Sequence, residues 1–222
     1  MKLSKRLSIC LKYAEGFNKL ADIGTDHALL PINAVTLGYV STAQAIDNKQ
    51  GPFVIAYSNV LKYELSDKIE VILGDGIKKI DDDVDCVVIS GMGGSLVSDI
   101  ILKDKIQNIK RFILQPNNDS QLVRKAIVKI GFHIVDELVF SDNHKIYDLI
   151  VADIGVTQYS ELEIEFGPIN LKEKPHFFIQ RIDKEIAKLQ NVLPNITTKS
   201  RKEEIKSRLN RLEEVVKWTG NK

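Results

Sequence analysis

The sequence has few of the residues from which small proteins build crosslinks and metal centres. It holds two cysteines, Cys10 and Cys86, which lie far apart and match no zinc or redox spacing. His133, His144 and His176 share no metal-ligand spacing either. We therefore expect reduced cysteines that fill space, no disulfide framework and no bound metal.

Long apolar segments are also missing. No run of 18 apolar residues occurs, and the amino-terminal stretch has no apolar core of signal-peptide length. With 44% hydrophobic residues, 27% charged residues and a net charge of +1, the chain has a soluble composition. We expect a cytosolic protein outside the membrane, whose 222 residues form one substantial core and a smaller appendage.

The charge is unevenly distributed along the chain. Residues 1–171 contain 18 Lys and Arg against 23 Asp and Glu, whereas residues 172–222 contain 13 against 7. The carboxyl-terminal part is therefore a separate basic unit, suited to contact with a polyanion.

Short apolar runs alternate with helical patterns after an amphipathic, basic helix at residues 3–15. The runs are "KLADI" (19–23), "TAQAID" (42–47), "KIEVILGD" (68–75), "VDCVVISG" (84–91) and "RFILQP" (111–116), with helix candidates near 28–38, 50–64, 94–103 and 119–130. Strands alternating with helices at this pace predict an α/β fold with a parallel sheet covered on both faces.

The pattern changes in the last third of the chain. Residues 132–142 and 145–155 are two strand-like runs with no room for a helix between them, so they predict an antiparallel hairpin at the edge of the sheet. Two amphipathic helical patterns follow, separated by Pro194 and Asn195, and predict a coiled-coil-like helical hairpin. We expect domains at 1–157 and 158–222.

The turn after the first strand reads "ADIGTDHALLP" and lacks a phosphate cradle. It has one glycine, Gly24, instead of a GxGxxG pattern, and it carries the carboxylates of Asp22 and Asp26. Those carboxylates would repel a pyrophosphate in a poorly screened cleft. The turn therefore favours a ligand that bears a cation, such as the ammonium and sulfonium groups of S-adenosylmethionine.

The ends of the next strands add further acids and exposed backbone. Strand two ends in Asp47, 23 residues after Gly24, a position from which an acid reaches a ribose diol. Strand three ends in "GDG", which presents Asp75, and strand four ends in "SGMGG". Because ligands of open α/β sheets lie across the carboxyl ends of the strands, we expect Asp47 to bind ribose hydroxyls and Asp75 an adenine amino group.

The motifs "LSKRL", "ADIGTDHALLP", "GDG", "ISGMGG", "QPN" and "KIYDLIVADIG" together resemble the bacterial tRNA (adenine-22-N1)-methyltransferase family. The likeness covers the whole chain. It implies a class I, Rossmann-like methyltransferase domain, a coiled-coil-like tail, S-adenosylmethionine as donor, and N1 of adenine 22 in the D-arm of tRNA as acceptor. The cofactor-binding positions that it implies are Asp22, Gly24, Asp26, His27, Asp47, Asp75, Gly76 and Gly91, and we also expect Asn48 and Met92 to bind the cofactor.

The predicted acceptor side of the site lacks a motif that many other methyltransferases carry after strand four. Methyltransferases that act on exocyclic amino groups often carry Asn or Asp, two prolines and an aromatic residue after strand four, whereas residues 90–93 read Ser-Gly-Met-Gly. Neutral adenine N1 already has an in-plane lone pair, so catalysis is mainly alignment. We expect a flipped adenine to contact Met92, Gln115, Asn117 and Tyr147, and Asp26 to stabilise the charge on the ring.

Several alternatives stay open at this point. A nucleotide-dependent oxidoreductase and a non-catalytic adaptor are the rival functions. Asp26 could instead cap a helix beginning at His27, Gln115 and Asn117 could simply end a strand, and Tyr147 could pack rather than touch RNA.

We expect a monomer, although the helical hairpin could also close on a second copy. For tRNA contact we expect Lys5 and Arg6 in the first helix and Arg181, Lys184 and Lys188 in the tail; a solvated basic face is the alternative.

Overall fold

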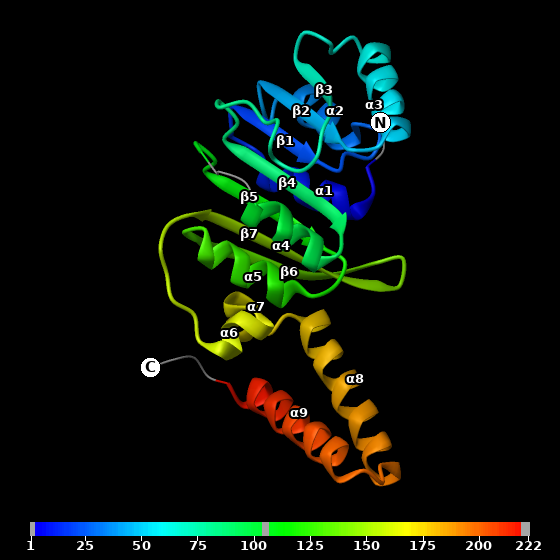
Figure 1. Cartoon of the computed structure of the whole chain (residues 1–222), viewed down its shortest axis with the longest axis vertical. Helices are drawn as coiled ribbons and strands as arrows, with labels where there is room; N and C mark the ends of the chain where they lie inside the picture. Colours follow the sequence, from blue (N-terminus) through cyan, green and yellow to red (C-terminus); the bar gives the residue numbers. More distant parts are fainter. Residues whose placement is uncertain (1–2, 104–106, 219–222) are drawn as a thin grey trace.

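The computed structural model describes residues 3–103 and 107–218. Within these residues a seven-stranded sheet has the order β3-β2-β1-β4-β5-β7-β6 (Figure 1). The strands are β1 (Lys19–Ile23), β2 (Thr42–Asp47), β3 (Ile69–Leu73), β4 (Cys86–Met92), β5 (Arg111–Pro116), β6 (Phe132–Asp142) and β7 (Lys145–Ile154). The first five are parallel and β7 is antiparallel to both β5 and β6, which confirms the predicted sheet and its antiparallel edge.

Helices cover both faces of the sheet, so its inner strands are buried on both sides and read as continuous apolar runs. One core lies under α1 (Lys5–Tyr13), α2 (Leu29–Thr36) and α3 (Gln50–Lys62), and the other under α4 (Gly94–Lys103) and α5 (Ser120–Lys129). Successive strand residues alternate between them: Leu20 faces the first core and Ala21 the second. Cys10 and Cys86 are both free and buried, as predicted.

The β6–β7 hairpin extends past the rest of the sheet. Pairing between β5 and β7 ends at Leu114 and Ile150, whereas β6 and β7 stay paired to Asp142 and Lys145. The five remaining residues of β7 project about 16 Å beyond that point. This hairpin arm, residues 138–149, therefore overhangs the edge at which the parallel strands end (Figure 1).

The tail contains two more helices than the sequence predicted. Short helices α6 (Glu161–Phe166) and α7 (Pro168–Glu173) precede the predicted helical pair, α8 (His176–Val192) and α9 (Lys199–Lys217), which a 3-10 turn (Leu193–Asn195) connects. Six-residue helices are too short to show a periodic pattern. Their signals were local: a capping box from Ser160 to Glu163, and Pro168 in the first turn of α7.

A buried ion pair joins the tail to the sheet. Arg124 of α5 donates to Glu137 of β6 at 2.7 Å, and their side chains are 2% and 0% exposed. Arg124 also donates to carbonyls at the end of α6, and Glu137 accepts from the Ile169 N–H at the start of α7. Burial raises the pKa of Glu137, while Arg124 and these N–H groups oppose the shift. The pair thus satisfies two helix ends at once.

Gly167, between α6 and α7, lies directly against this pair. Its φ of +98° favours glycine, and a Cβ atom there would collide with the carboxylate of Glu137. The close approach of the tail to β6 therefore requires this glycine.

None of the helices in the described part of the chain combines the length and apolar character that a membrane span requires.

The buried pair generates a stability prediction. We expect Arg124→Met to lower the free energy of unfolding by about 3–5 kcal/mol, because it leaves Glu137 buried without its cation. The matched control is Arg201→Met, which removes an exposed arginine paired with Glu204 and should cost less than about 1 kcal/mol. Urea denaturation measures both values; similar small losses would contradict the role assigned to the buried pair.

Candidate active site

The predicted cofactor residues lie at one edge of the sheet, around the point where strand order reverses. β1 lies between β2 and β4, so the loops that follow these strands leave in opposite directions and open a crevice. Asp22 lies near the end of β1 and residues 24–27 follow it, Asp47 ends β2 and Asn48 follows it, and Gly91 and Met92 end β4. The fold therefore gathers the acids that the sequence placed at separate strand ends.

Asp22 is the buried acid of the site. It is 5% exposed, and the Thr25 hydroxyl donates to its Oδ2 at 2.6 Å. Burial raises the pKa of Asp22 to about 6; Thr25 opposes the shift, and the neighbouring charges of Asp26 and Asp47 add to it. A cation placed beside Asp22 would relieve both the burial and the repulsion. Sequence reasoning missed Thr25, because a threonine three residues from an acid is not a motif.

Gly24 brings the end of β1 against the end of β4. Its φ is +72°, and its N–H donates to the Ile46 carbonyl at 2.8 Å. A Cβ atom at Gly24 would collide with Cε of Met92, so the methionine side chain lies directly on this glycine. Met92 is half-buried and also packs against the second core. Its flexible thioether forms part of the crevice floor.

Asp26 and His27 are exposed at the rim. His27 Nε2 lies 3.2 Å from Asp26 Oδ1, and both His27 and Ala28 adopt positive φ values. The helix that follows begins at Leu29, and its N-cap, Ala28, provides no side-chain hydrogen bond. The alternative in which Asp26 caps a helix beginning at His27 is therefore wrong, and both side chains remain available to a ligand.

The ends of β2 and β3 form the second part of the crevice. Asp47 Oδ1 accepts from the Lys49 N–H at 2.8 Å, and the other carboxylate oxygen of Asp47 has no hydrogen-bond partner within the described residues. Asn48 Nδ2 donates to Asp75 Oδ1 at 3.5 Å, which connects the two strand ends. Gly76 follows with a φ of +60°. Asp47 thus keeps one carboxylate oxygen free for a ligand, whereas Asp75 accepts a hydrogen bond from Asn48.

Asn117 holds the end of β4 in place. Its N–H donates to the Met92 carbonyl at 2.8 Å and its Nδ2 donates to the Gly91 carbonyl at 2.6 Å. A second asparagine, Asn118, accepts from the Gly94 N–H at 3.0 Å through its side chain. Sequence reasoning missed Asn118, whose only signal is its place in "QPNN" directly after β5.

Gln115 does not reach the crevice, contrary to the expectation that it contacts adenine. Its side chain is 0% exposed, accepts from the Ser90 hydroxyl at 3.2 Å and donates to the Pro116 carbonyl. Gln115 lies opposite Ser90 in the β4–β5 register, so both side chains bond within the sheet. Gln115 is a positioning residue for the end of β4.

Arg6 of α1 lies close to Gly91, at the end of β4. Its Nη1 is 3.0 Å from where a Cβ of Gly91 would stand, and its guanidinium lies 6.0 Å above the ring of Tyr147. Tyr147 in turn packs on Phe140 of the hairpin arm, with 5.9 Å between the ring centroids. Lys5 donates to the Ser141 carbonyl of the same arm at 2.7 Å. Arg6 and Tyr147 therefore form one wall beside the exposed backbone of β4.

Arg181 is not free to bind RNA as predicted. It donates to both oxygens of Asp148 at 2.9 and 3.0 Å, and Ser120 donates to the same carboxylate at 2.7 Å. Burial pushes the pKa of Asp148 upward, but Arg181 and Arg124 outweigh it and hold the pKa below its usual value. Arg181 therefore joins the tail to the hairpin arm.

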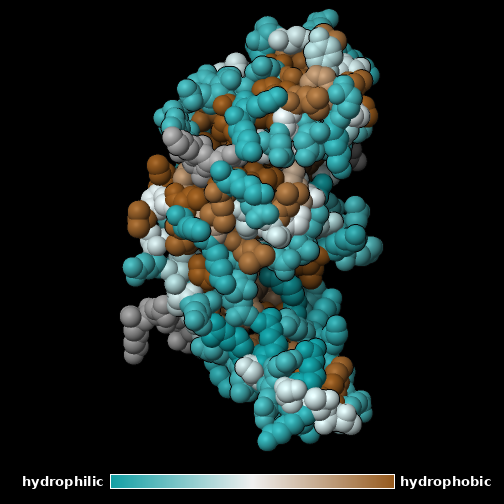
Figure 2. Space-filling view, viewed as in Figure 1, coloured by the Kyte–Doolittle hydropathy of each residue, from teal (hydrophilic) through white to brown (hydrophobic). Residues whose placement is uncertain are grey.

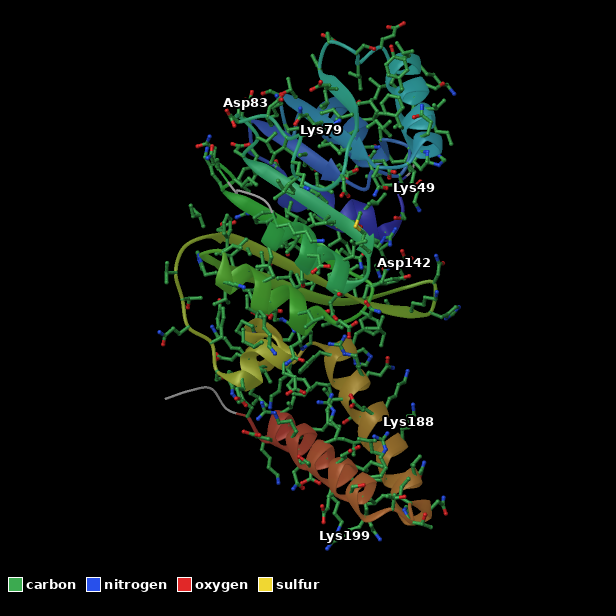
Figure 3. The ribbon with its side chains drawn as sticks, in the orientation of Figure 1. Lys49, Lys79, Asp83, Asp142, Lys188 and Lys199 are labelled. Atoms are coloured by element: carbon green, nitrogen blue, oxygen red, sulfur yellow. The ribbon has the colours of Figure 1, made fainter. Side chains whose placement is uncertain are left out.

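The remaining tail cations differ in their partners, and one of them, Lys174, donates to the Val216 carbonyl. Arg201, Arg208, Arg211 and Lys217 form ion pairs within the tail. The exposed lysines that form no ion pair within the described residues are Lys172, Lys184, Lys188, Lys199, Lys202 and Lys206. Figure 2 shows a mostly hydrophilic tail, and Figure 3 places Lys188 and Lys199 in the part farthest from the sheet. The free positive charge of the tail is thus carried by lysines.

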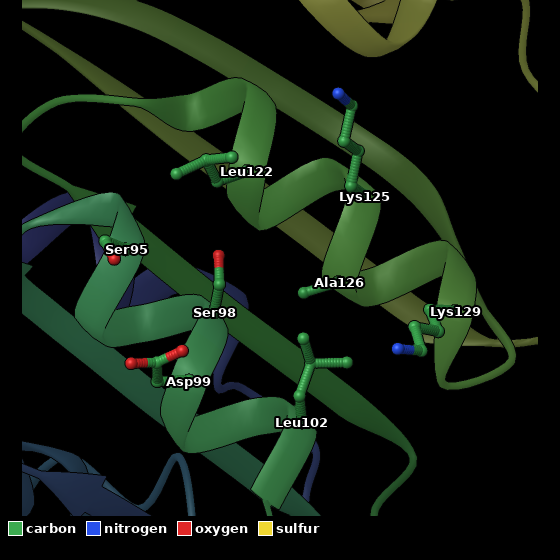
Figure 4. Close-up of a pocket in the computed structure, with 8 residues that line it drawn as sticks. All are labelled: Ser95, Ser98, Asp99, Leu102, Leu122, Lys125, Ala126 and Lys129. Atoms are coloured by element: carbon green, nitrogen blue, oxygen red, sulfur yellow. The ribbon is translucent and has the colours of Figure 1, made fainter.

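A hollow between α4 and α5 is a separate feature (Figure 4). It has a volume of about 310 Å³ and includes Leu102, Leu122 and Ala126, with Lys125, Lys129 and Asp99 around it. It runs along helices on one face of the sheet rather than across the strand ends. Within the described residues, no group of three or more His, Cys, Asp or Glu side chains is arranged to hold a metal ion.

Comparisons with known proteins agree with this geometry. The TrmK family, described as tRNA (adenine(22)-N(1))-methyltransferase, matches residues 20–219. The tRNA (adenine(22)-N(1))-methyltransferase of Bacillus subtilis is 34% identical over 221 residues, covering 96% of this chain and 93% of the relative.

Two solved structures show the same fold with ligands. A Streptococcus pneumoniae protein in complex with S-adenosyl-L-methionine is 31% identical, with a TM-score of 0.86 over 97% of this chain and 100% of its own. M. capricolum TrmK in complex with S-adenosyl-homocysteine is 31% identical, with a TM-score of 0.89 over 98% of this chain and 99% of its own. The family and the methyltransferase fold that the motifs predicted are confirmed. This chain belongs to the tRNA (adenine(22)-N(1))-methyltransferase family.

Proposed function

We propose that this protein transfers a methyl group from S-adenosylmethionine to N1 of adenine 22 in the D-arm of tRNA. Family membership supports the reaction, and the buried Asp22 supports the donor, because its acidic surroundings favour a cationic ligand. An assay with labelled donor and tRNA, followed by mass spectrometry of the product, tests the proposal. Tight binding of NADH without any binding of S-adenosylhomocysteine would contradict it.

The acids of the crevice fit each part of the donor. When bound, S-adenosylmethionine supplies an electrophilic methyl group on a positively charged sulfur. Asp22 and Asp26 with Gly24 and His27 hold the cationic amino-acid end, and the exposed backbone of Gly91 allows close approach beside Met92. Asp47 and Asn48 accept the ribose hydroxyls, and Asp75 with Gly76 holds the adenine.

The acceptor base enters beside the end of β4. Adenine N1 attacks through its own lone pair, so the protein provides alignment rather than a general base. Met92 contacts one side of the base, and Asn117 and Tyr147 border the position that it takes. Gln115 acts through its hydrogen bonds to Ser90 and Pro116 and does not contact the base. Asp26 stabilises the positive charge that develops on the ring.

The tail contributes tRNA binding. Residues 1–157 form the catalytic unit and residues 158–222 the RNA-binding unit, which α6 and α7 anchor through Arg124 and Glu137. Lys184 and Lys188 lie four residues apart on one side of α8, and Lys199, Lys202 and Lys206 share one side of α9. With Lys5 and Arg6 near the crevice, these cations contact tRNA phosphates. Helix α8 packs on β6 of its own catalytic unit, which supports a monomer. The reaction places the protein in the cytoplasm with its tRNA.

The buried acid generates a prediction on pH. Because the pKa of Asp22 is about 6 and a cationic ligand favours the ionised form, binding of S-adenosylhomocysteine should weaken about tenfold for each pH unit below that value. Calorimetry at pH values from about 5 to 8 measures this dependence. Asp22→Asn should bind weakly with a flat profile; a flat wild-type profile would contradict the assignment.

Protonation of Asp22 does not weaken ligand binding at low pH by unfolding the protein. An acid whose folded pKa is raised holds more protons in the folded state than in the unfolded state. Its contribution to stability therefore falls as pH rises from the ordinary value of 3.8 to about 6. At the acidic end, Asp22 favours the folded protein while it disfavours the ligand.

Asp47 generates a second prediction. Asp47→Ala should weaken S-adenosylhomocysteine binding about 10- to 100-fold, since hydrogen bonds to a charged group are worth roughly 1.5–3 kcal/mol. Asp47→Asn is the matched variant: it keeps an acceptor for the Lys49 N–H and removes only the charge. We expect an intermediate affinity by calorimetry and unchanged thermal stability. Wild-type affinity in both variants would remove Asp47 from the site.

The tail lysines generate a third prediction. The double variant Lys184→Gln/Lys188→Gln should reduce the slope of log Kd for tRNA against log salt by about 1.5, since each phosphate contact contributes roughly 0.7–0.9. The control Arg201→Gln/Lys217→Gln removes the same charge from residues paired with Glu204 and Glu213, so its slope should change less. Filter binding at several salt concentrations distinguishes the two; equal changes would mean that only net charge matters.

A further inference from the structure

A cleft between the catalytic unit and the tail begins where the acceptor site ends. It has a volume of about 440 Å³, within the range of small-molecule sites. Its lining comes from the β5–α5 loop, α5, the hairpin arm, α6, α8 and α9. Asn117 lines this cleft and also holds the backbone of Gly91 and Met92, so the two spaces share a wall.

Acids outnumber arginines in the cleft lining, which includes Asp119, Asp148, Glu165 and Glu185. Three arginines line it, and each is already ion-paired: Arg124 with Glu137 at 2.7 Å, Arg181 with Asp148 at 2.9 Å, and Arg208 with Glu185 at 2.7 Å. A phosphate would have to compete with these carboxylates and approach Asp119 as well. The cleft therefore suits a neutral ligand with polar edges rather than the phosphate backbone of RNA.

The other lining groups match a flat heteroaromatic ring. Ile146 is half-buried and gives one of the ring's faces an apolar contact, with Phe166 and Ile182 buried beneath the cleft surface. Gln121, in the first turn of α5, is half-buried, and its side chain forms no hydrogen bond within the described residues. A carboxamide offers donors and an acceptor together, which is the combination that reads the edge of a base.

We infer that this cleft receives an unstacked nucleobase of the tRNA next to the methylated adenine, and that Gln121 reads the edge of that base. Extrusion of one nucleotide into the acceptor site breaks the stacking on both of its neighbours. A neighbouring base is therefore available to enter the adjoining cleft. The inference rests on the proposed function. It adds a specificity-determining residue outside the methyl-transfer site.

The test uses the full chain and tRNA transcripts that carry each of the four bases at the nucleotides directly 5′ and 3′ of the methylated adenine. Wild-type enzyme should prefer one base at one of these positions by about tenfold or more in kcat/KM. Gln121→Ala should lose that preference and reduce kcat/KM for the preferred tRNA about tenfold, with KM for the methyl donor unchanged. Gln121→Glu, which replaces the amide donors by an acceptor, should change which base is preferred.

The control is Gln190→Ala, which removes an exposed glutamine of α8 outside the cleft and should behave as wild type. Thermal melting shows whether each variant folds. A wild-type enzyme without base preference at either position, or Gln121 variants that keep it, would overturn the inference while the methyltransferase function stands. An equal loss on all transcripts would indicate a phosphate contact and also overturns it. A wild-type enzyme inactive on every tRNA would overturn both proposals.

Discussion

The buried pair of Arg124 and Glu137 is the interaction on which the arrangement of the two units depends. Its charges are taken out of water and compensate each other, and the end of α6 at the guanidinium and the start of α7 at the carboxylate supply their further hydrogen bonds. Isolated six-residue helices are marginal in water, so tertiary contact must hold them. The pair holds the start of the tail against the sheet, and the contact of Arg181 with Asp148 holds α8. The cleft beside the acceptor site exists because of this geometry.

The crevice is organised around positive charge. Asp22 is buried, repelled by Asp26 and Asp47, and supported by a single threonine hydroxyl, so its ionised form gains from a cation placed beside it. Methyl transfer to a neutral ring nitrogen moves that positive charge from the donor to the base. Carboxylates at the rim can stabilise this positive charge both before and after the transfer. The arginines near β4 and in the tail make other contacts. Arg6 lies over the ring of Tyr147, and Arg181 is paired with Asp148 of the hairpin arm.

Much of the fold was predictable because the inner strands are buried on both faces. Residues 19–23, 42–47 and 111–116 were predicted with the observed bounds, and the hairpin followed from the absence of a crossover helix. The short helices α6 and α7 were not, because their stability comes from Arg124 and Glu137 rather than from an apolar period. Gln115 and Arg181 were assigned to ligand binding from residue type alone. Their partners, Ser90 and Asp148, lie 25 and 33 residues away in sequence.

The sequence by itself determined the family, the parallel sheet with its antiparallel edge, and the acids at the strand ends, because these depend on local order and on the side chains that a strand end exposes. Tertiary structure decided which of those groups remain free. Burial gives Asp22 its raised pKa, Arg181 is ion-paired with Asp148, and the lysines keep the unpaired charge of the tail. Such outcomes depend on contacts between residues far apart in the chain, which only the folded arrangement brings within a few ångströms.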